Sequence, residues 1–318
     1  MKKSILAASL ATAVLAQIPA AQALTIGYAT HHFDDKFSTI LRNGSQAYAE
    51  SLGHEMIQVD AQLDVGKQLD QVNNFIANGV DGLIIQSVDS TAAAPMSRAA
   101  AEAGIPTVFV NRKPTPLESM AQGQAYVASN EVESGTYQTY EMCMQLRAEG
   151  KSNGARGYLL VGDLASEAAV QRTIDAEQVV QLDMCNFMEI IGKETAMWQR
   201  NEAQDLMTNW LSTGEEFDFV IANNDEMALG AIQAMKAAGI DMKDVVVGGV
   251  DATDDALAAM RGGDLDVTVF QNAKAQGEGA IDALLKLING EEVPREYYIP
   301  FELITPEILK THPELSKM

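Results

Sequence analysis

The sequence predicts an α/β protein of two lobes, each a doubly wound parallel sheet with helices on both faces. Three observations predict this fold class. Apolar strand-like runs alternate with segments of helical periodicity almost to the end of the chain, and such alternation is typical of parallel sheets. The roughly ten predicted strands exceed what one sheet of this kind usually holds. Five of the runs also end in polar residues, which indicates a shared binding edge.

Each element is predicted from its own periodicity. In the segment 64–78, for example, Val72 and Phe75 fall on one apolar helical face, and Gly79 stands where the helix should end. Strands are expected at 25–29, 55–59, 82–86, 107–110, 125–128, 157–161, 186–191, 217–221, 245–250 and 267–270. Helices are expected at 64–78, 91–103, 134–148, 167–180, 201–211, 225–238 and 273–289.

The chain should cross between the lobes three times. The first crossing is expected near Ser129, the second where helix 273–289 returns to the first lobe, and the third within 297–304. Three crossings form a hinge, and hinge closure around a ligand is a known use of two-lobed α/β proteins. The predicted division is 24–129 plus 272–298 for the N-terminal lobe and 130–271 plus 299–318 for the C-terminal lobe.

The first 23 residues have the pattern of an export signal. Lys2 and Lys3 precede a short apolar stretch at 5–15, and Ala21-Gln22-Ala23 forms a small-x-small cleavage site. The alternative, a short membrane anchor, is disfavoured because the apolar stretch is shorter than the ~20 residues that span a bilayer. We expect cleavage after Ala23 and release into a bacterial periplasm.

The charge of the chain excludes two classes of partner. The formal net charge is −22, and removing Lys2 and Lys3 with the signal leaves −24. An acidic surface of this kind repels nucleic acid and anionic membranes. We therefore expect neither as a partner.

Cysteine and histidine usage predicts no metal site. The two cysteines, Cys143 and Cys185, show no zinc spacing with the four histidines. An exported protein can hold a disulfide, but sequence leaves two alternatives open, a disulfide or two buried thiols. No cofactor is expected.

Enzyme motifs are lacking. The sequence contains no G-x-S-x-G elbow, phosphate-binding loop or H-E-x-x-H pattern. We therefore expect no enzyme; the alternative kept open is a hydrolase or lyase that uses Asp35 or Asp251 as a base.

Polar side chains at the strand ends favour binding of hydroxyl groups. Asp35, Asn111, Asn224, Asp251 and Gln271 each follow or end an apolar run. Carboxylates accept hydrogen bonds from hydroxyls, and amides both donate and accept. The alternative role for each single Asp or Asn is a helix N-cap; agreement of five positions on one sheet edge is what favours a pocket.

Arginines and aromatic residues complete the predicted pocket. Arg112 and Arg172 can each fork two donors onto neighbouring hydroxyl oxygens, and Asp35 and Asp251 are expected to supply the carboxylates that balance their charge. Asp225 is expected to act mainly as a helix cap. The apolar faces for a ring-shaped ligand are assigned to Phe33, Phe37 and Trp198.

Six ordered motifs give the chain a family resemblance. They are Phe33-Asp34-Asp35-Lys36-Phe37, the residues 104–111 (GIPTVFVN), 194–198 (ETAMW), 221–230 (IANNDEMALG), 249–252 (GVDA) and 268–271 (TVFQ). Together they resemble the periplasmic sugar-binding proteins of ABC transporters, the type I group that includes ribose- and galactose/glucose-binding proteins. The resemblance implies two Rossmann-like lobes, joined by a three-strand hinge, that close on a ligand.

The resemblance also implies roles for the pocket residues. Phe37 and Trp198 resemble the aromatic residues that stack on the two faces of a sugar. Contacts of the galactose/glucose type are implied for Asp35, Asn111, Trp198, Asn224 and Asp251. Arg172 matches an arginine of both branches, whereas Arg112 and Gln271 resemble the ribose branch.

Two departures from the galactose/glucose branch shift the expected ligand. Ser166 and Ala168 stand where that branch has a His and an Asp, and the segment 148–153 lacks the alternating oxygen ligands of its calcium loop. No calcium is therefore expected. The mixed pocket favours a monosaccharide or cyclic polyol of the ribose, galactose or myo-inositol type.

The resemblance implies a monomeric substrate-binding protein of an ABC importer. Its partners would be a small neutral sugar or polyol, an ABC permease in the inner membrane and, further, a chemoreceptor. The alternative is a ligand-sensing subunit that docks a membrane chemoreceptor or histidine kinase. Both share this fold, so the sequence leaves the choice open.

Overall fold

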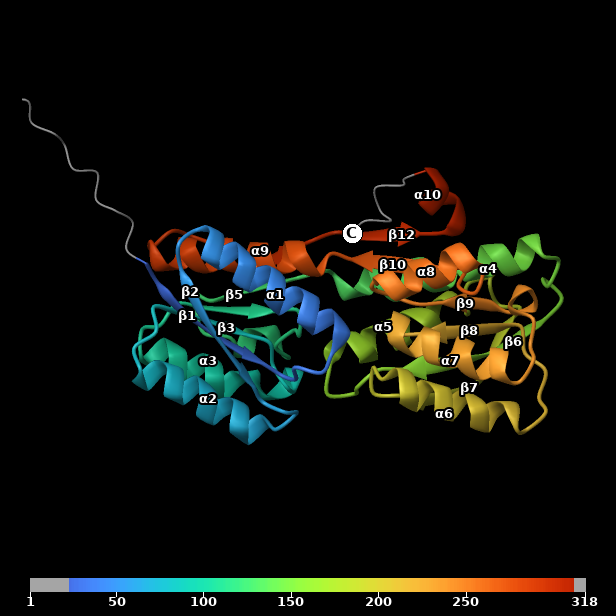
Figure 1. The fold of residues 1–318 in the computed structure, drawn as a ribbon, viewed down its shortest axis with the longest axis horizontal. Coiled ribbons are helices and arrows are strands. Elements are labelled where there is room, and N and C mark those ends of the chain that lie inside the picture. Colours follow the sequence, from blue (N-terminus) through green and yellow to red (C-terminus); the bar gives the residue numbers. More distant parts are fainter. Residues whose placement is uncertain (1–22, 312–318) are drawn as a thin grey trace, which may run out of the picture.

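The computed structural model describes residues 23–311, which form two α/β lobes side by side (Figure 1). All but the last residue of the predicted export signal (1–22) and the last seven residues of the chain lie outside the described part. The first lobe holds a six-stranded, wholly parallel sheet in the order β11-β5-β4-β3-β1-β2. Its strands are β1 (Thr25–Thr30), β2 (Glu55–Asp60), β3 (Gly82–Ile85), β4 (Thr107–Val110), β5 (Ala125–Ala128) and β11 (Glu296–Tyr298). Its helices are α1 (Lys36–Ser51), α2 (Val65–Ala77), α3 (Ala93–Glu102) and α9 (Ala273–Ile288).

The second lobe holds a four-stranded parallel sheet in the order β7-β6-β8-β9, and an antiparallel pair, β10-β12, lies beside it. Two parallel bridges, Gly248 to Val267 and Asp251 to Phe270, tie the β10 region to the end of β9. The strands are β6 (Ala155–Val161), β7 (Met188–Thr195), β8 (Phe219–Ala222), β9 (Val246–Gly248), β10 (Thr268–Gln271) and β12 (Phe301–Ile304). The helices are α4 (Glu131–Ala148), α5 (Glu167–Val179), α6 (Arg200–Leu211), α7 (Asp225–Ala237), α8 (Asp254–Gly262) and α10 (Pro306–Thr311).

The chain passes between the lobes three times, as predicted. The passages lie between β5 and α4, between β10 and α9, and between β11 and β12. Helix α9 packs on α1 and against β4, so it belongs to the first lobe although it follows the second in sequence, and it lies there in Figure 1. We propose lobe limits of 24–129 plus 272–298 and 130–271 plus 299–318; the strand pairing supports them within residues 24–311, and 312–318 lie outside the described part.

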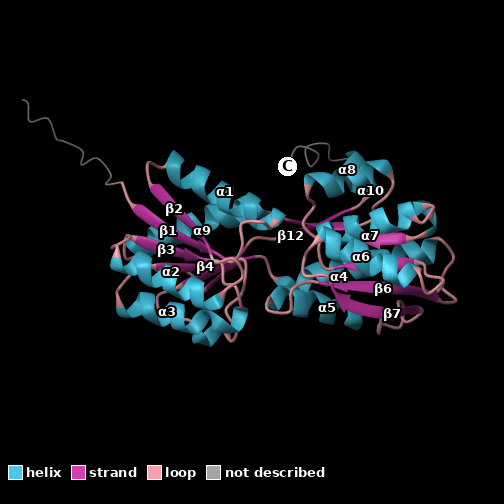
Figure 2. Cartoon of the chain, turned by 60° about the horizontal axis from the view of Figure 1, so that its bottom comes forward, coloured by secondary structure: helices cyan, strands magenta, loops and turns pink. Residues whose placement is uncertain are grey.

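Alternation of buried side chains explains why helices cover both faces of the first sheet (Figure 2). In β1, Ile26 and Tyr28 face the apolar core under α1 and α9, whereas Ala29 faces the core under α2 and α3. In β4, Val108 joins the first of these cores and Phe109 the second. Successive side chains of a strand point to opposite faces, so strands buried on both sides read as continuous apolar runs.

Several predicted elements have different limits, and two of them show the physical reason. The strand predicted at 186–191 begins at Met188 and extends to Thr195, because the residues before it form a turn that contains Cys185. The stretch predicted at 297–304 is divided into β11 and β12 around Pro300, since proline has no N–H to donate to a strand partner. Neither change alters the order of the elements.

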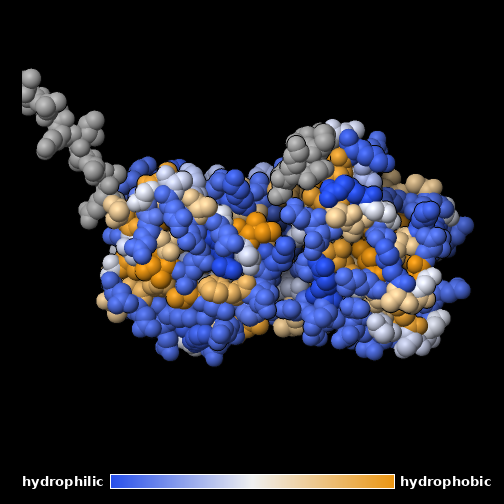
Figure 3. Space-filling view, viewed as in Figure 1, coloured by the Kyte–Doolittle hydropathy of each residue, from blue (hydrophilic) through white to orange (hydrophobic). Residues whose placement is uncertain are grey.

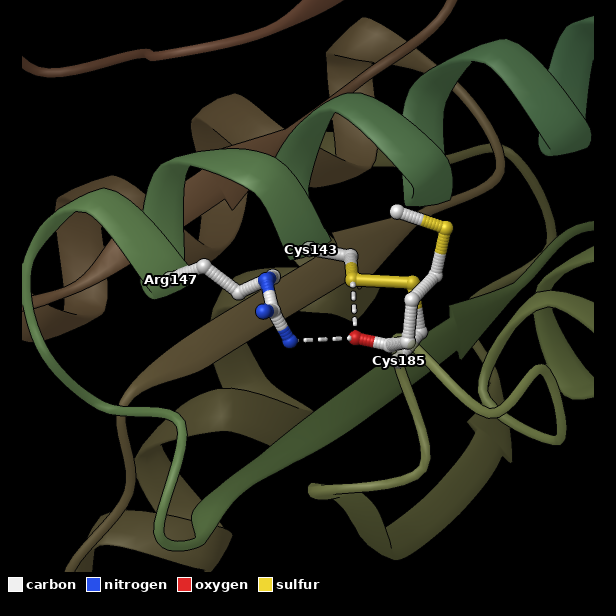
Figure 4. The surroundings of a disulfide bond; sticks show 4 residues. Cys143, Arg147 and Cys185 are labelled. Carbon is white, nitrogen blue, oxygen red and sulfur yellow. Dashed lines mark hydrogen bonds between the residues drawn. A yellow bond between two sulfur atoms is a disulfide. The ribbon is translucent and has the colours of Figure 1, made fainter.

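The two cysteines form a disulfide and are not free thiols (Figure 4). Cys143 lies on α4 and Cys185 in the turn before β7, with their Cα atoms 5.7 Å apart. Both are fully buried in the core between α4, α5 and the second sheet. Nearby, Arg147 donates from Nη1 to the carbonyl oxygen of Met184 at 3.0 Å. The bond therefore anchors the turn before β7 to α4.

The face in Figure 3 is mainly hydrophilic, with scattered apolar patches, as is usual for a protein surface. Among residues 23–311, no helix is both long and apolar enough to cross a membrane. Within the same residues, no group of three or more His, Cys, Asp or Glu side chains is placed to hold a metal ion.

Candidate ligand-binding site

A polar cavity lies between the two lobes, next to the carboxyl ends of strands from both sheets. The cavity is small, with a volume of about 40 Å³. Its lining contains nine of the ten residues predicted from sequence. The lining residues are His31, Asp35, Phe37, Ser38, Asn111, Arg112, Ser166, Ala168, Arg172, Trp198, Asn224, Asp251 and Gln271.

Phe33 is the predicted residue that does not line this cavity. It lies in a neighbouring groove that shares Asp35 and Trp198 with the cavity and also contains Arg200. The guanidinium of Arg42 sits 4.3 Å from the centre of its ring, so a cation–π contact occupies one ring face. The role of apolar wall in the first lobe falls to Phe37, which is buried in the first turn of α1.

Asp35 serves both as a helix cap and as a wall of the cavity. Its Oδ1 accepts a hydrogen bond from the backbone N–H of Ser38 at 2.6 Å, which caps α1. The second carboxylate oxygen is not used in the cap. The two roles that sequence presented as alternatives are therefore combined in one side chain.

Asn111 is held in a strained backbone conformation. Its φ is +62°, a region that residues other than glycine adopt at a cost of order 1–3 kcal/mol. Its Oδ1 accepts from Gln86 Nε2 at 3.0 Å, and its carbonyl oxygen accepts from the Tyr126 hydroxyl at 2.9 Å. These contacts fix the amide at the end of β4 and orient its Nδ2 group.

Arg112 joins the two lobes. From Nη1 it donates to the carbonyl oxygen of Val88 at 2.7 Å and lies 3.3 Å from Oδ2 of Asp163. Asp163 stands in the second lobe, directly after β6. The direct ion pair of Arg112 crosses the cleft to Asp163, and the charge of Asp35, the predicted partner, also favours the protonated guanidinium from a longer distance.

Arg172 is held by a buried carboxylate that sequence did not single out. Glu131 accepts from Arg172 Nε at 2.8 Å and from Nη2 at 3.1 Å. Arg172 also donates to the carbonyl oxygen of Asn223 at 2.7 Å and to Oε1 of Gln271 at 3.2 Å. Four of its five N–H groups are thus engaged. The fifth lies on Nη1, which is 4.0 Å from Asp251.

Asp251 is the buried carboxylate that faces the cavity. Within residues 23–311 its one ionic contact is the 4.0 Å approach of Arg172, which is too long for a hydrogen bond. Burial raises the pKa of Asp251 well above its ordinary value; Arg172 opposes the shift and Asp225 adds to it. Asp251 therefore helps to balance Arg172, as predicted, but Glu131 makes the closer contact, and no hydrogen bond to the Asp251 carboxylate is found within residues 23–311.

Asp225 holds the loop that carries Asp251, and it is not the N-cap of α7. The cap is Asn224, whose Oδ1 accepts from Met227 N at 3.0 Å. Asp225 is fully buried and accepts from Thr253 N at 2.8 Å and from the Thr268 hydroxyl at 2.7 Å. These bonds hold the loop in which Asp251 has a φ of +121°. Burial raises the pKa of Asp225 to about 7.

Trp198 forms the apolar wall of the second lobe. A Cβ atom on Gly162, at the end of β6, would lie 2.3 Å from the indole ring, so only glycine leaves room for it. Trp198 has a φ of +65°, and its carbonyl oxygen accepts from Asn224 Nδ2 at 3.4 Å. The guanidinium of Arg172 lies 5.6 Å from its ring centre. Tight packing therefore fixes the ring against the cavity.

A scan of the sequence against family models matches residues 26–292 to a periplasmic binding protein domain. The match covers most of the chain. The protein belongs to the periplasmic binding protein family. Its architecture agrees, because solved structures of the same fold are two-lobed type I binding proteins.

Several relatives of this binding protein are known. A putative rhizopine-binding protein of Rhizobium meliloti is 55% identical over 96% of both chains. The ribose import binding protein of Bacillus subtilis is 31% identical, covering 88% of this chain and 87% of the relative. A solute-binding protein of an ABC transporter from Bacillus halodurans, solved with bound myo-inositol, superimposes with a TM-score of 0.84 at 37% identity, covering 92% of this chain and 98% of the other.

Sequence reasoning missed two kinds of residue in this binding protein. His31 and Ser38 line the cavity; burial and the charge of Arg112 lower the pKa of His31 well below its ordinary value, so its imidazole is neutral. Glu131 and Asp163 hold the arginines. Asp163 follows β6 directly, so the strand-end pattern could have found it, whereas Glu131 was missed because α4 was predicted to start three residues too late.

Proposed function

We propose that the protein binds a neutral monosaccharide or cyclic polyol between its lobes and presents it to an ABC permease in the inner membrane. The observation that carries the proposal is that carboxylates outside the cavity make the close contacts with the two arginines. Glu131 and Asp163 contact Arg172 and Arg112 from outside the cavity. The Asp251 carboxylate therefore remains available to accept hydrogen bonds from ligand hydroxyls.

The proposed contacts suit a ring that carries several hydroxyls. Asp35 and Asp251 accept from hydroxyl groups, and the remaining N–H of Arg172 donates to a hydroxyl oxygen. Phe37 and Trp198 offer apolar walls from opposite lobes for the C–H faces of the ring. We propose that Asn111, Arg112 and Asn224 complete the contacts, while Gln271 acts mainly by holding Arg172.

The relatives support this ligand class. The names of two of them specify a rhizopine and ribose, and the solved solute-binding protein holds myo-inositol. We propose a cyclic polyol of the inositol type as the ligand, since that structure is 37% identical to this chain. Membership of a solute-binding family also supports a role in transport without catalysis.

Export and assembly complete the proposal. The family is periplasmic, and we propose that the signal is removed after Ala23. We further propose that the mature protein is a monomer, and that the closed form also docks a chemoreceptor.

A ligand panel tests the proposal. Isothermal calorimetry and thermal shift would be run with myo-inositol, other inositols, a rhizopine, ribose, xylitol, galactose and glucose. We expect saturable binding of a cyclic polyol at micromolar or lower dissociation constant, weakened in Asp251→Asn and unchanged in the exposed control Asp254→Asn. If no sugar or polyol stabilises the protein, the proposed ligand class is wrong.

A further inference from the structure

Helix α5 of the second lobe begins without a cap of its own. Its N-cap residue is Ser166, whose side chain makes no capping hydrogen bond. The backbone N–H of Glu167, in the first turn, instead donates to Oγ of Ser90 at 3.1 Å. Ser90 belongs to the first lobe, in the short 3-10 helix that follows β3. The start of α5 is thus completed by a side chain from the opposite lobe.

A second hydrogen bond joins the two lobes at the same place. The N–H of Ser90 donates to the carbonyl oxygen of Ala165 at 2.9 Å. Ser90 and Ser166 are both only 3% exposed, so these bonds are shielded from water. A hydrogen bond in such a buried position is costly to leave unmade.

The loop that carries Ser90 is rigidly tied to its own lobe. The carbonyl oxygen of Ser90 accepts from Thr115 N at 2.8 Å, and Oδ1 of Asp89 accepts from Thr91 N at 2.7 Å. Arg112 donates to the carbonyl oxygen of Val88 just before it and reaches Asp163 across the cleft at 3.3 Å. The two lobes are therefore joined here by three polar contacts that involve no ligand.

We propose that Ser90 is the centre of a closure latch that sets how long the ligand is held. The latch consists of Ser90 bound to Ala165 and Glu167, together with the ion pair of Arg112 and Asp163. Helix α5 also carries Ala168 and Arg172 of the cavity, so the latch positions the second-lobe half of the site. Any separation of the lobes breaks these bonds, which makes their free energy part of the closing equilibrium. The inference rests on the proposed ligand binding by closure.

The rate of ligand release measures the latch directly. A bound ligand escapes only when the lobes open, so weakening the closed form raises the dissociation rate. Ser90→Ala removes the acceptor for Glu167 N but keeps the backbone bond to Ala165. We expect release, measured by stopped-flow tryptophan fluorescence, to be about fivefold faster, the factor that corresponds to one net hydrogen bond.

Two further variants separate the latch from general stability. Asp163→Asn weakens the ion pair but keeps the side chain's acceptor for Ala165 N, and it should also speed release severalfold. The matched control is Ser97→Ala, because Ser97 is likewise buried but bonds only within the first lobe, to Gln124 and Ala121. The control should lower the melting temperature without changing the release rate.

A measurement without ligand distinguishes failure of the latch from failure of the proposed function. Small-angle X-ray scattering of the ligand-free protein should give a larger radius of gyration for the Ser90→Ala, Asp163→Asn double variant than for the wild type. If no ligand in the panel binds, the scattering measurement alone tests whether the latch exists. Unchanged scattering, or release rates in both single variants equal to those of the control, would overturn the latch.

Discussion

Replacing Glu131 by glutamine should disturb the binding site without touching any residue that lines it. Glu131 and Arg172 are each 4% exposed at the side chain, and the carboxylate accepts both parallel bonds from the guanidinium. Glutamine keeps one acceptor but turns an N–H₂ group toward an arginine N–H. The substitution leaves a buried arginine charge without its partner.

The expected cost follows from that geometry. Breaking a buried ion pair by changing one partner costs about 3–5 kcal/mol; because glutamine preserves one of the two bonds, we expect the lower end, about 3 kcal/mol, in urea unfolding. The free guanidinium should then turn to Asp251, now 4.0 Å away. Asp251 would then pair with Arg172 and no longer accept hydrogen bonds from the ligand. Ligand affinity should therefore fall by tenfold or more, about 1.4 kcal/mol.

A neighbouring glutamate provides the control. Glu133 lies one half-turn further along α4, is only partly buried and accepts a single bond from Asn130 Nδ2 at 3.2 Å. Glu133→Gln should change the free energy of unfolding by less than about 1 kcal/mol and leave affinity unchanged. Equal effects of the two variants, or an effect of Glu131→Gln below about 0.5 kcal/mol, would refute the assignment of Glu131 as the carboxylate that holds Arg172.

Three further predictions follow from the same structure. Asp251→Asn should raise the melting temperature of the ligand-free protein, because burial already disfavours the carboxylate, yet lower ligand affinity by about 2 kcal/mol; calorimetry that shows no loss would place Asp251 outside the site. The pKa of Asp225 rises from 3.8 to about 7 in the fold, so the folded protein holds this proton more tightly than the unfolded chain does. The stability that protonation supplies is complete below about pH 4 and is lost as the pH rises to about 7; unfolding curves across this range should therefore fall more steeply for the wild type than for Asp225→Asn, and parallel curves would contradict the shift. Replacing Cys143 and Cys185 together by alanine should cost about 4 kcal/mol, the loop-entropy value for a separation of 42 residues, as measured by denaturant unfolding, whereas two reactive thiols in the denatured, unreduced wild type would show that the bond is absent.

Much of the fold could be predicted because its signals are local. The alternation in β1 and β4 follows from residues that lie next to each other in sequence. The polar strand ends could be grouped without a structure, because the carboxyl ends of parallel strands meet at one edge of the sheet. Nine of the ten predicted site residues accordingly line one cavity.

The errors concern which side chains pair with each other. Asp35 and Asp251 were expected to balance the arginines; they contribute at longer range, whereas Glu131 and Asp163 make the close contacts. Phe33 differs from Phe37 only by four positions, yet it packs on Arg42 outside the cavity. Such pairings depend on rotamers and on distances between elements far apart in sequence, which periodicity does not encode.

By itself, the sequence determined the two-lobed α/β class, the three crossings and the set of polar residues at the cleft, since strand, helix and turn signals act over a few residues. Tertiary structure alone decided that the arginines are contacted closely by carboxylates outside the cavity, that Asp251 stays open to a ligand, and that Ser90 caps a helix of the other lobe. Burial and closeness create those properties: a carboxylate becomes a partner, a cap or a ligand contact according to what lies within about 3 Å of its oxygens.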